Sequence, residues 1–287
     1  MNQVQTYYKH SGNTTFLGML LLNLAGLASV MILGAIYGYA LWYIPFIYLK
    51  IVATVALGGL LGWLIGLAGK MGHIRNKWVL YYFGILFGIG AVYMGWVFWI
   101  FISSKQTLMI LNPRVIWLLL ERIAVRGAWS LGGVPVHGFL LYLIWFMEAF
   151  IIIGVSTWVA GKVISKAVYC ETCQSWIKPN HTVYPLEPVG DISALKFAIE
   201  KGDFSTLFAL KKINLSSRYY THLELTLCPG CEMFHLLTVT MVATHTNKKG
   251  QEKEKRQAII KNFIITPGTY QMLLALDKPV DEPVPNY

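Results

Sequence analysis

The stretch that decides the fold is FLLYLIWFMEAFIIIGVSTWVAG, residues 139–161, followed closely by Cys170-Glu-Thr-Cys173. An apolar run of this length crosses a hydrocarbon core of about 30 Å. Two cysteines separated by two residues are typical of a metal-binding turn. The sequence therefore predicts a membrane domain over residues 16–161 and a small water-exposed domain over residues 162–276.

Three further apolar runs precede this stretch, and the composition agrees with them. The chain is 55% hydrophobic and only 13% charged, whereas soluble proteins carry about 25% charged residues. The first fifteen residues are polar and lead into a long apolar run, which predicts a tail and a membrane anchor rather than a cleavable signal peptide. The three runs predict spans over residues 16–38, 51–69 and 78–103. Between the first two, residues 37–50 are rich in aromatics around Pro45, which indicates a turn at the level of the lipid headgroups.

Positive charge predicts the orientation. Lys70, Arg75 and Lys77 lie in the short loop between the second and third spans, and such loops are cytoplasmic. Counting outward from this loop places the N-terminus inside, and the fourth span returns the chain to the cytoplasm beside Lys162 and Lys166. The absence of targeting features favours a bacterial inner membrane, with the small domain in the cytoplasm.

Residues 104–138 fit this topology poorly, because a loop predicted to be outside carries several cations. Residues 113–126 (PRVIWLLLERIAVR) form an amphipathic pattern opened by Pro113, and proline is favoured in a first helical turn. The charged residues share one side of this predicted helix, so the helix either lies in the membrane interface or caps the bundle. A helix that instead spanned the membrane would place the small domain outside.

Glu148 is the only acidic residue in any predicted span. A carboxyl at that depth is costly and is a functional candidate by default, as an ion or proton site or as a contact to a partner protein. The alternative is a protonated glutamate bonded to another helix of this chain, with Asn23 as the donor.

Small residues recur every fourth position in the spans, so they share a helix face. Close backbone contact through small residues holds membrane helices together. This face serves either internal packing of the chain, a homo-oligomeric interface or the lining of a pore. Its residues are Gly58, Gly62 and Gly66 in the second span and Gly84 and Gly88 in the third, with Gly34 and Gly38 repeating the spacing in the first.

The four cysteines of the chain form two pairs, Cys170-x-x-Cys173 and Cys228-Pro-Gly-Cys231. Two such turns complete a tetrahedral Zn–S4 shell and leave no position open for a water molecule. We therefore predict one structural Zn²⁺ per chain. A redox pair or, with inverted topology, disulfides are the alternatives. The nearby His181, His222 and His235 are expected to be surface or core residues, since four cysteines suffice.

The second turn, Leu-Cys-Pro-Gly-Cys-Glu, resembles the knuckle of the zinc-ribbon family, and the resemblance covers residues 167–247. It implies a fold and not a function. The 54 residues between the two pairs exceed the family's usual spacing, so the sequence predicts an insertion with short helices over 191–201 and 204–212. Strands are expected over 219–227, 234–246 and 258–265, a charged loop over 248–256, a short helix over 269–276 and an extended Pro-rich tail over 277–287.

The predicted fold class is an all-α membrane domain of four helices with both termini inside and one interfacial helix, followed by a small α+β zinc-ribbon-like domain. No nucleotide-binding loop, hydrolase elbow or kinase signature occurs, so we expect a non-enzymatic membrane subunit that docks partner proteins through the zinc domain. A small ion or proton channel or transporter using Glu148 is the alternative. The partners would be lipids and other membrane or cytosolic proteins, or further copies of the chain. Residues 162–287 carry fifteen Lys/Arg against twelve Asp/Glu, a net +3, which argues against nucleic acid as a partner.

Overall fold

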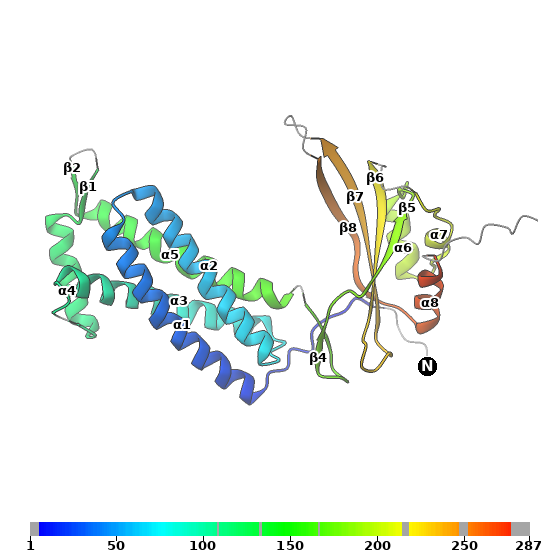
Figure 1. The fold of residues 1–287 in the computed structure, drawn as a ribbon, viewed down its shortest axis with the longest axis horizontal. Coiled ribbons are helices and arrows are strands. Elements are labelled where there is room, and N and C mark those ends of the chain that lie inside the picture. Colours follow the sequence, from blue (N-terminus) through cyan, green and yellow to red (C-terminus); the bar gives the residue numbers. More distant parts are fainter. Residues whose placement is uncertain are drawn as a thin grey trace, which may run out of the picture. The chain divides into compact units, whose positions relative to one another are not determined.

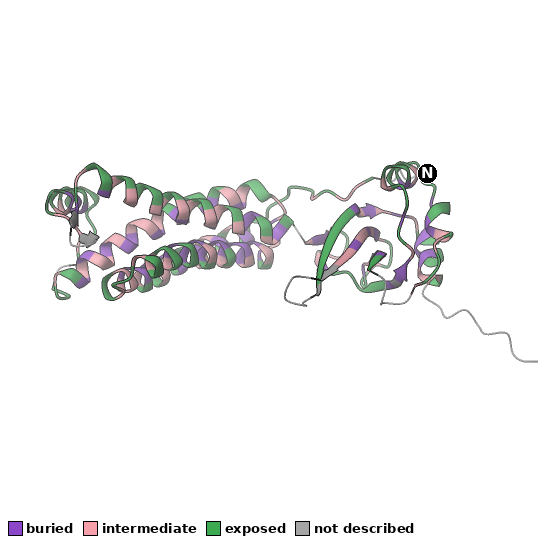
Figure 2. Ribbon diagram, turned by 90° about the horizontal axis from the view of Figure 1, so that it is seen from above, coloured by how far each residue is buried: buried purple, intermediate pink, exposed green. Residues whose placement is uncertain are grey.

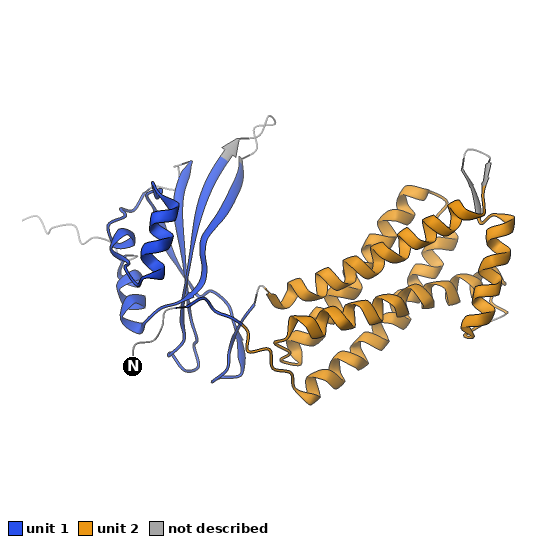
Figure 3. Cartoon of the chain, turned by 180° about the vertical axis from the view of Figure 1, so that it is seen from behind, with its two compact units in different colours: residues 1–9, 167–287 blue, residues 10–166 orange. Residues whose placement is uncertain are grey.

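The computed structural model describes residues 6–107, 109–131, 134–165, 167–213, 218–246 and 252–276. The chain forms two compact units, a helical unit of residues 10–166 and a β-sheet unit of residues 1–9 and 167–287 (Figure 3). The predicted Pro-rich tail, Lys166 and residues 248–251 of the predicted charged loop lie outside the described residues.

The helical unit contains four helices that are long and apolar enough to cross a membrane. Each contains one of the predicted spans and is longer than it. In the bundle, α1 packs on α2 and α3, and α5 packs on α2 and α3. The helices are α1 (Phe16–Tyr43), α2 (Ile47–Met71), α3 (Lys77–Ser103) and α5 (Phe139–Ser165) (Figure 1).

The connection between α1 and α2 is shorter than predicted. Only residues 44–46 are non-helical there, because the aromatic residues of 37–50 belong mainly to the last turns of α1 and the first turn of α2. Lys50 consequently lies within α2 and not in a turn. At the other end of α1, the Thr15 hydroxyl donates to the Gly72 carbonyl at 2.8 Å, so the start of α1 and the α2–α3 loop lie together.

The predicted amphipathic helix is α4 (Pro113–Arg126). Its buried residues, Ile116, Leu120 and Ala124, lie on one side, and Ala124 packs against Leu141 of α5. On other sides, Trp117, Leu118 and Val125 are exposed. The helix ends at Gly127, whose φ of 91° lies in the region that favours glycine. A short hairpin, β1 (Trp129–Leu131) and β2 (Val134–Val136), connects α4 to α5.

Large apolar side chains cover the outside of the helical unit. Along α1 alone, Leu20, Leu24, Leu27, Ile32 and Ile36 are exposed, and exposed residues run the length of the four long helices (Figure 2). A helix that is apolar on all sides is typical of a membrane span or of the centre of a large protein.

The β-sheet unit is built on a four-stranded antiparallel sheet in the order β5-β6-β7-β8. Helices α6, α7 and α8 lie on one face of the sheet (Figure 1), and the sheet and these helices together form the main hydrophobic core of the unit. A separate hairpin, β3 (Val168–Cys170) and β4 (Ser175–Ile177), precedes the sheet. The remaining elements are β5 (His181–Leu186), α6 (Ile192–Glu200), α7 (Ser205–Phe208), β6 (Tyr219–Leu227), β7 (His235–Thr246), β8 (Glu252–Ile264) and α8 (Pro267–Ala275).

Several features of this unit differ from the prediction. Strands β3, β4 and β5 were not predicted. The helix predicted over 204–212 is wrong for its second half, because α7 ends at Phe208 and Lys212 instead pairs with Leu186 in an antiparallel bridge. Strand β8 begins at Glu252, so the prediction of a charged loop over 248–256 is wrong for its second half. Residues 253–258 of β8 are exposed, so its charged side chains contact water. They lie on the last strand of the four-stranded sheet, where charges oppose pairing with other chains.

Residues 6–8 extend the sheet at this edge. Tyr7 pairs with Phe263 in an antiparallel bridge, and the backbone N–H of Ile264 donates to the Thr6 carbonyl at 2.9 Å. The Tyr7 hydroxyl donates to Glu200 Oε1 at 2.6 Å. Partial burial and the neighbouring Glu200 carboxylate raise the pKa of Tyr7 to about 12. The start of the chain is therefore part of the same folded unit as residues 167–276.

Candidate functional site

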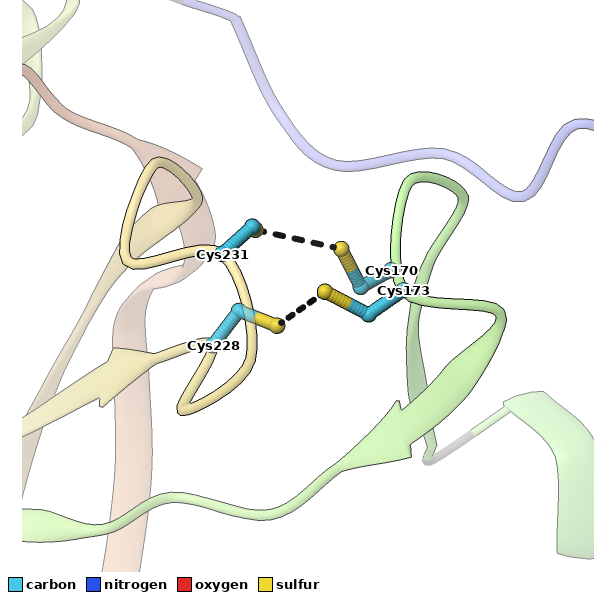
Figure 4. A group of neighbouring side chains, drawn as sticks. All are labelled: Cys170, Cys173, Cys228 and Cys231. Carbon is cyan, nitrogen blue, oxygen red and sulfur yellow. Dashed lines mark hydrogen bonds between the residues drawn. The ribbon is translucent and has the colours of Figure 1, made fainter.

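The four cysteines meet between two tight turns of the β-sheet unit. Cys170 is the last residue of β3, and Cys173 lies in the turn between β3 and β4. Cys228 and Cys231 lie in the turn between β6 and β7 (Figure 4). All four sulfur atoms lie within 4.8 Å of one another. The structure thus brings together two pairs that are far apart in the sequence, in a group able to hold a metal ion.

The spacing of the sulfurs suits a tetrahedral shell. Cys170 Sγ lies 3.7 Å from Cys231 Sγ, and Cys228 Sγ lies 3.5 Å from Cys173 Sγ. Metal–sulfur bonds near 2.3 Å in a tetrahedron give sulfur–sulfur edges of about 3.8 Å. All four cysteines are free thiols, and the observed separations are far longer than the ~2.05 Å of a disulfide bond.

The turns prepare the sulfurs to be ligands. Gln174 and Glu232, which directly follow the second cysteine of each pair, have positive φ values of 49° and 52°. The chain therefore reverses sharply after each pair. Burial of the Cys228 thiol opposes its ionisation. However, the backbone N–H groups of Cys231 and Gly230, with hydrogen bonds to the Cys173 and Cys170 thiols, lower its pKa to about 7. A lowered pKa favours the thiolate form of Cys228, which is the form that binds a metal.

Hydrogen bonding within the group has the opposite effect on Cys173. The hydrogen bond with Cys228 is the main cause that raises the pKa of Cys173 to about 12, with burial and the other thiols adding to it. A proton shared among closely spaced sulfurs is what a metal cation displaces when it binds.

An apolar shell covers two of the four cysteines. Cys170 and Cys228 are buried and pack with Val168, Ile177 and Leu236. Tyr8 also covers this cluster: its ring lies 5.8 Å from that of Phe234, and its hydroxyl accepts from the Tyr169 backbone N–H at 2.9 Å. Cys173 and Cys231 are half-buried. Because four thiols face one another, the geometry offers a metal four sulfur ligands and suits a structural role better than a catalytic one.

None of the nearby histidines joins the four-cysteine group. His235 is buried with its ring 4.8 Å from that of Tyr270, and burial lowers its pKa. His222 lies 3.4 Å from Glu224. His181 stands 6.2 Å from the Tyr270 ring.

Gly230 permits the close approach of the two turns. A Cβ atom at this position would lie 2.8 Å from Cys173 Sγ, which is too close for an ordinary contact. We expect Gly230→Ala to push the turns apart and to weaken metal affinity by about 10- to 100-fold, the range seen when residues that support ligands are changed. Competition with a chromophoric chelator, with Zn²⁺ as the probe, measures this.

The matched control is Gly190→Ala, in the same unit, where a Cβ would meet nothing within 4 Å. Equal zinc affinities for the two variants would contradict the expected role of Gly230.

The structure places Glu148 at a polar cluster in the helical unit. The Tyr37 hydroxyl of α1 donates to Glu148 Oε1 and lies 2.9 Å from Thr54 Oγ1 of α2. The Asn23 carboxamide instead donates to the Met19 carbonyl of its own helix at 2.9 Å, so Glu148 and Asn23 are not brought together. The reason is helix length: α5 continues to Ser165, about one turn beyond the predicted span, so Glu148 lies at the level of the end of α1.

The glycine faces meet α5. Cβ atoms at Gly58 and Gly62 of α2 would clash with the backbone of Ile152 and Ser156, and those at Gly84 and Gly88 of α3 would clash with α5 as well. Gly66 faces Val163 of the same helix at a Cβ separation of 2.7 Å. In the first helix, Gly34 and Gly38 face α3. These glycines therefore lie at contacts within one chain.

Ser156 is the residue at the centre of this packing that the sequence did not single out. It is fully buried, and its hydroxyl donates to the Gly84 carbonyl at 3.0 Å. The spacing of the glycines in α2 and α3 predicts a small residue on the helix that packs against them. A search of α5 for such a residue could have identified Ser156.

No protein-family model, curated protein or solved structure matches this chain.

Proposed function

We propose that the chain is a non-enzymatic integral membrane subunit whose small zinc-stabilised domain docks partner proteins. The four long helices are the membrane anchor, and the membrane is the inner membrane of a bacterium. The β-sheet unit lies in the cytoplasm, where thiols stay reduced. The observation that carries this proposal is the closed group of four cysteines, which suits a metal that holds a domain together and leaves no ligand position open to a substrate.

Membrane insertion is supported by the outside of the helical unit. Its exposed leucine, isoleucine, phenylalanine and tryptophan side chains would be costly in water and are at no disadvantage in lipid. The cations of the α2–α3 loop, which lies together with the start of α1, support a cytoplasmic location for that end of the bundle.

The pairing of residues 6–8 with β8 supports an even number of spans. Residues 1–9 and 167–287 belong to one folded unit, so both must emerge on the same side of a membrane. Four crossings, with α4 remaining on one side, satisfy this condition. A fifth crossing by α4 would not.

Zinc is the proposed metal because four cysteine sulfurs in a closed tetrahedral arrangement are the usual ligands of a structural zinc ion. A zinc-ribbon-like fold accounts for the two cysteine turns and for the β6–β7 hairpin, which contains the second turn.

Met233, which follows the second turn, is 79% exposed, and we propose that the surface around it is a docking surface.

A small channel or transporter is the second candidate. It is favoured by the position of Glu148, which lines a cavity of about 610 Å³ with Lys50 and Thr54. In this case Glu148 lies in the pathway, and Glu148→Gln abolishes flux in proteoliposomes while the protein still folds and inserts.

The decisive experiment is the mass and subunit composition of the complex extracted gently from its native membrane. A hetero-complex with defined stoichiometry is the expected result. A strictly solitary chain would contradict the docking role. A pure homo-oligomer would favour the second candidate and make the flux of the Glu148 variant the next measurement.

A further inference from the structure

A cavity of about 610 Å³ lies in the helical unit beside the α1–α2 turn. It is lined by residues of that turn and of α1, α2, α3 and α5, with Ala128 of the segment after α4. Its volume falls within the range of roughly 300–1,000 Å³ that is typical of small-molecule sites. Such sites have apolar and aromatic walls with a few polar groups, and this cavity has both.

The apolar wall is aromatic. The ring centroids of Trp96 and Trp145 lie 4.9 Å apart, with an angle of 79° between the ring planes. The ring centroids of Trp96 and Trp99 lie 5.8 Å apart, with an angle of 77° between the ring planes. All three rings line the cavity, together with Phe46 of the turn. Rings in mutually perpendicular planes present faces and edges in several directions, which suits contact with hydrocarbon and with the alkylated part of an ammonium group.

Two groups of opposite charge line the same cavity, Lys50 of α2 and Glu148 of α5. Among the residues that the structure describes, they form no direct ion pair with each other or with a third residue. Glu148 Oε1 accepts from Tyr37, which fixes the carboxyl at the cavity wall. Charged groups in an apolar setting are costly unless they are paired.

We propose that this cavity binds a single amphiphile with a zwitterionic headgroup. Its ammonium group pairs with Glu148, its phosphate with Lys50, and its hydrocarbon tail packs against the three tryptophans. An occupant with both charges satisfies both side chains, whereas an anion alone would face the carboxylate and a cation alone would face the ammonium of Lys50. A lipid with one tail fits the volume better than a large ligand. This inference rests on the proposed membrane insertion of the helices and not on the proposed docking role.

The test uses the full chain, purified in a non-ionic detergent, with binding followed by native mass spectrometry. The probes are lysophosphatidylethanolamine, which carries both charges and a tail, lysophosphatidylglycerol, which lacks the ammonium group, and a long-chain alkylamine, which lacks the phosphate. We expect the zwitterion to bind at least about tenfold more tightly than either singly charged probe, the effect of one additional charge-assisted contact.

Two variants identify the contacts. Glu148→Gln is expected to remove the preference for lysophosphatidylethanolamine over lysophosphatidylglycerol. Lys50→Met is expected to remove the preference for lysophosphatidylethanolamine over the alkylamine. Glu121→Gln and Lys77→Met, which change the same groups away from the cavity, should leave both preferences intact. Thermal unfolding of each variant shows separately that it is folded, and resistance of the protein to alkaline extraction from membranes tests insertion independently.

The proposal is overturned if Glu148→Gln and Lys50→Met retain the preferences of the unchanged protein, or if a singly charged probe binds as tightly as the zwitterion. Phosphoethanolamine without a tail distinguishes a soluble zwitterion from a lipid. If it displaces the lysolipid at equal concentration, the tail makes no contribution and the assignment of a lipid is wrong.

Discussion

Replacing Cys228 with serine is expected to abolish metal binding and to unfold the β-sheet unit. Binding of a structural zinc ion contributes on the order of 10 kcal/mol to the folding of small zinc domains, which is comparable to the whole stability of a typical domain, about 5–15 kcal/mol. Cys228 is fully buried and joins the second turn to the end of β6. A serine hydroxyl there leaves three sulfur ligands and a buried polar group.

Two measurements check this result. The zinc content of the purified protein should fall from about one ion per chain, the capacity of a single four-cysteine site, to none. Limited proteolysis should then cleave residues 167–276 while the helical unit stays intact. Met233→Ser is the matched control, because Met233 lies in the same turn region and is largely exposed. Metal-free protein with a protease-resistant β-sheet unit would contradict the structural role of the metal.

Gly62→Val is expected to destabilise the helical unit strongly. A Cβ at Gly62 would overlap the Ser156 backbone carbonyl and lie 2.9 Å from Ser156 Cα, so relief requires α2 and α5 to separate. Forcing extra atoms into a well-packed contact typically costs about 1–3 kcal/mol, and more where backbone is involved. Separation would also weaken the hydrogen bond between Ser156 and the Gly84 carbonyl, which joins α5 to α3.

The control for this prediction is Gly59→Val in the same helix. A Cβ at Gly59 would meet nothing within 4 Å, and the two substitutions change helix propensity in the same way. In detergent, Gly62→Val should unfold at a clearly lower temperature than Gly59→Val, with no change in oligomeric state. If Gly59→Val instead dissociated an oligomer and Gly62→Val were harmless, the glycine face within the chain would be unimportant for stability.

The helical unit could be predicted well because apolar runs of this length have few other solutions. All four long helices and α4 were expected, and for α4 both boundaries agree. The helix ends were harder to predict. Aromatic residues such as Tyr39 and Tyr43 are as acceptable in a last helical turn as in a turn between helices, so α1 was predicted too short. The end of α5 was likewise placed about one turn too early, which displaced the expected level of Glu148 and led to Asn23 as its partner, when the donor is Tyr37.

The spacing of the cysteines favoured a four-sulfur site, since two pairs leave no cysteine over, and the structure brings all four sulfurs together as free thiols. The surrounding sheet was only partly predictable. Strand β6 was expected with its exact bounds, because its leucines alternate. The first half of β8 has the sequence EKEKR, in which the charges mostly alternate in sign. Because an edge strand and a solvated loop can both have this composition, the pattern did not identify a strand. The residues that line the cavity come from four helices, the α1–α2 turn and the segment after α4, and no local pattern links Lys50 to Trp145.

The pairing of residues 6–8 with β8 also sets an order of events during synthesis. Residues 6–8 leave the ribosome before the four long helices, and their partners at 262–264 leave it after them. Tyr7 and Glu200, which are hydrogen-bonded in the finished fold, are separated by 193 positions. If the four long helices cross a membrane, as proposed above, residues 6–8 stay unpaired until the helices have been inserted. A wrong number of crossings would then leave the two pieces on opposite sides of the membrane, with an open sheet edge and a four-cysteine group that lacks the cover of Tyr8. On this proposal, completion of the sheet depends on the correct topology of the helices.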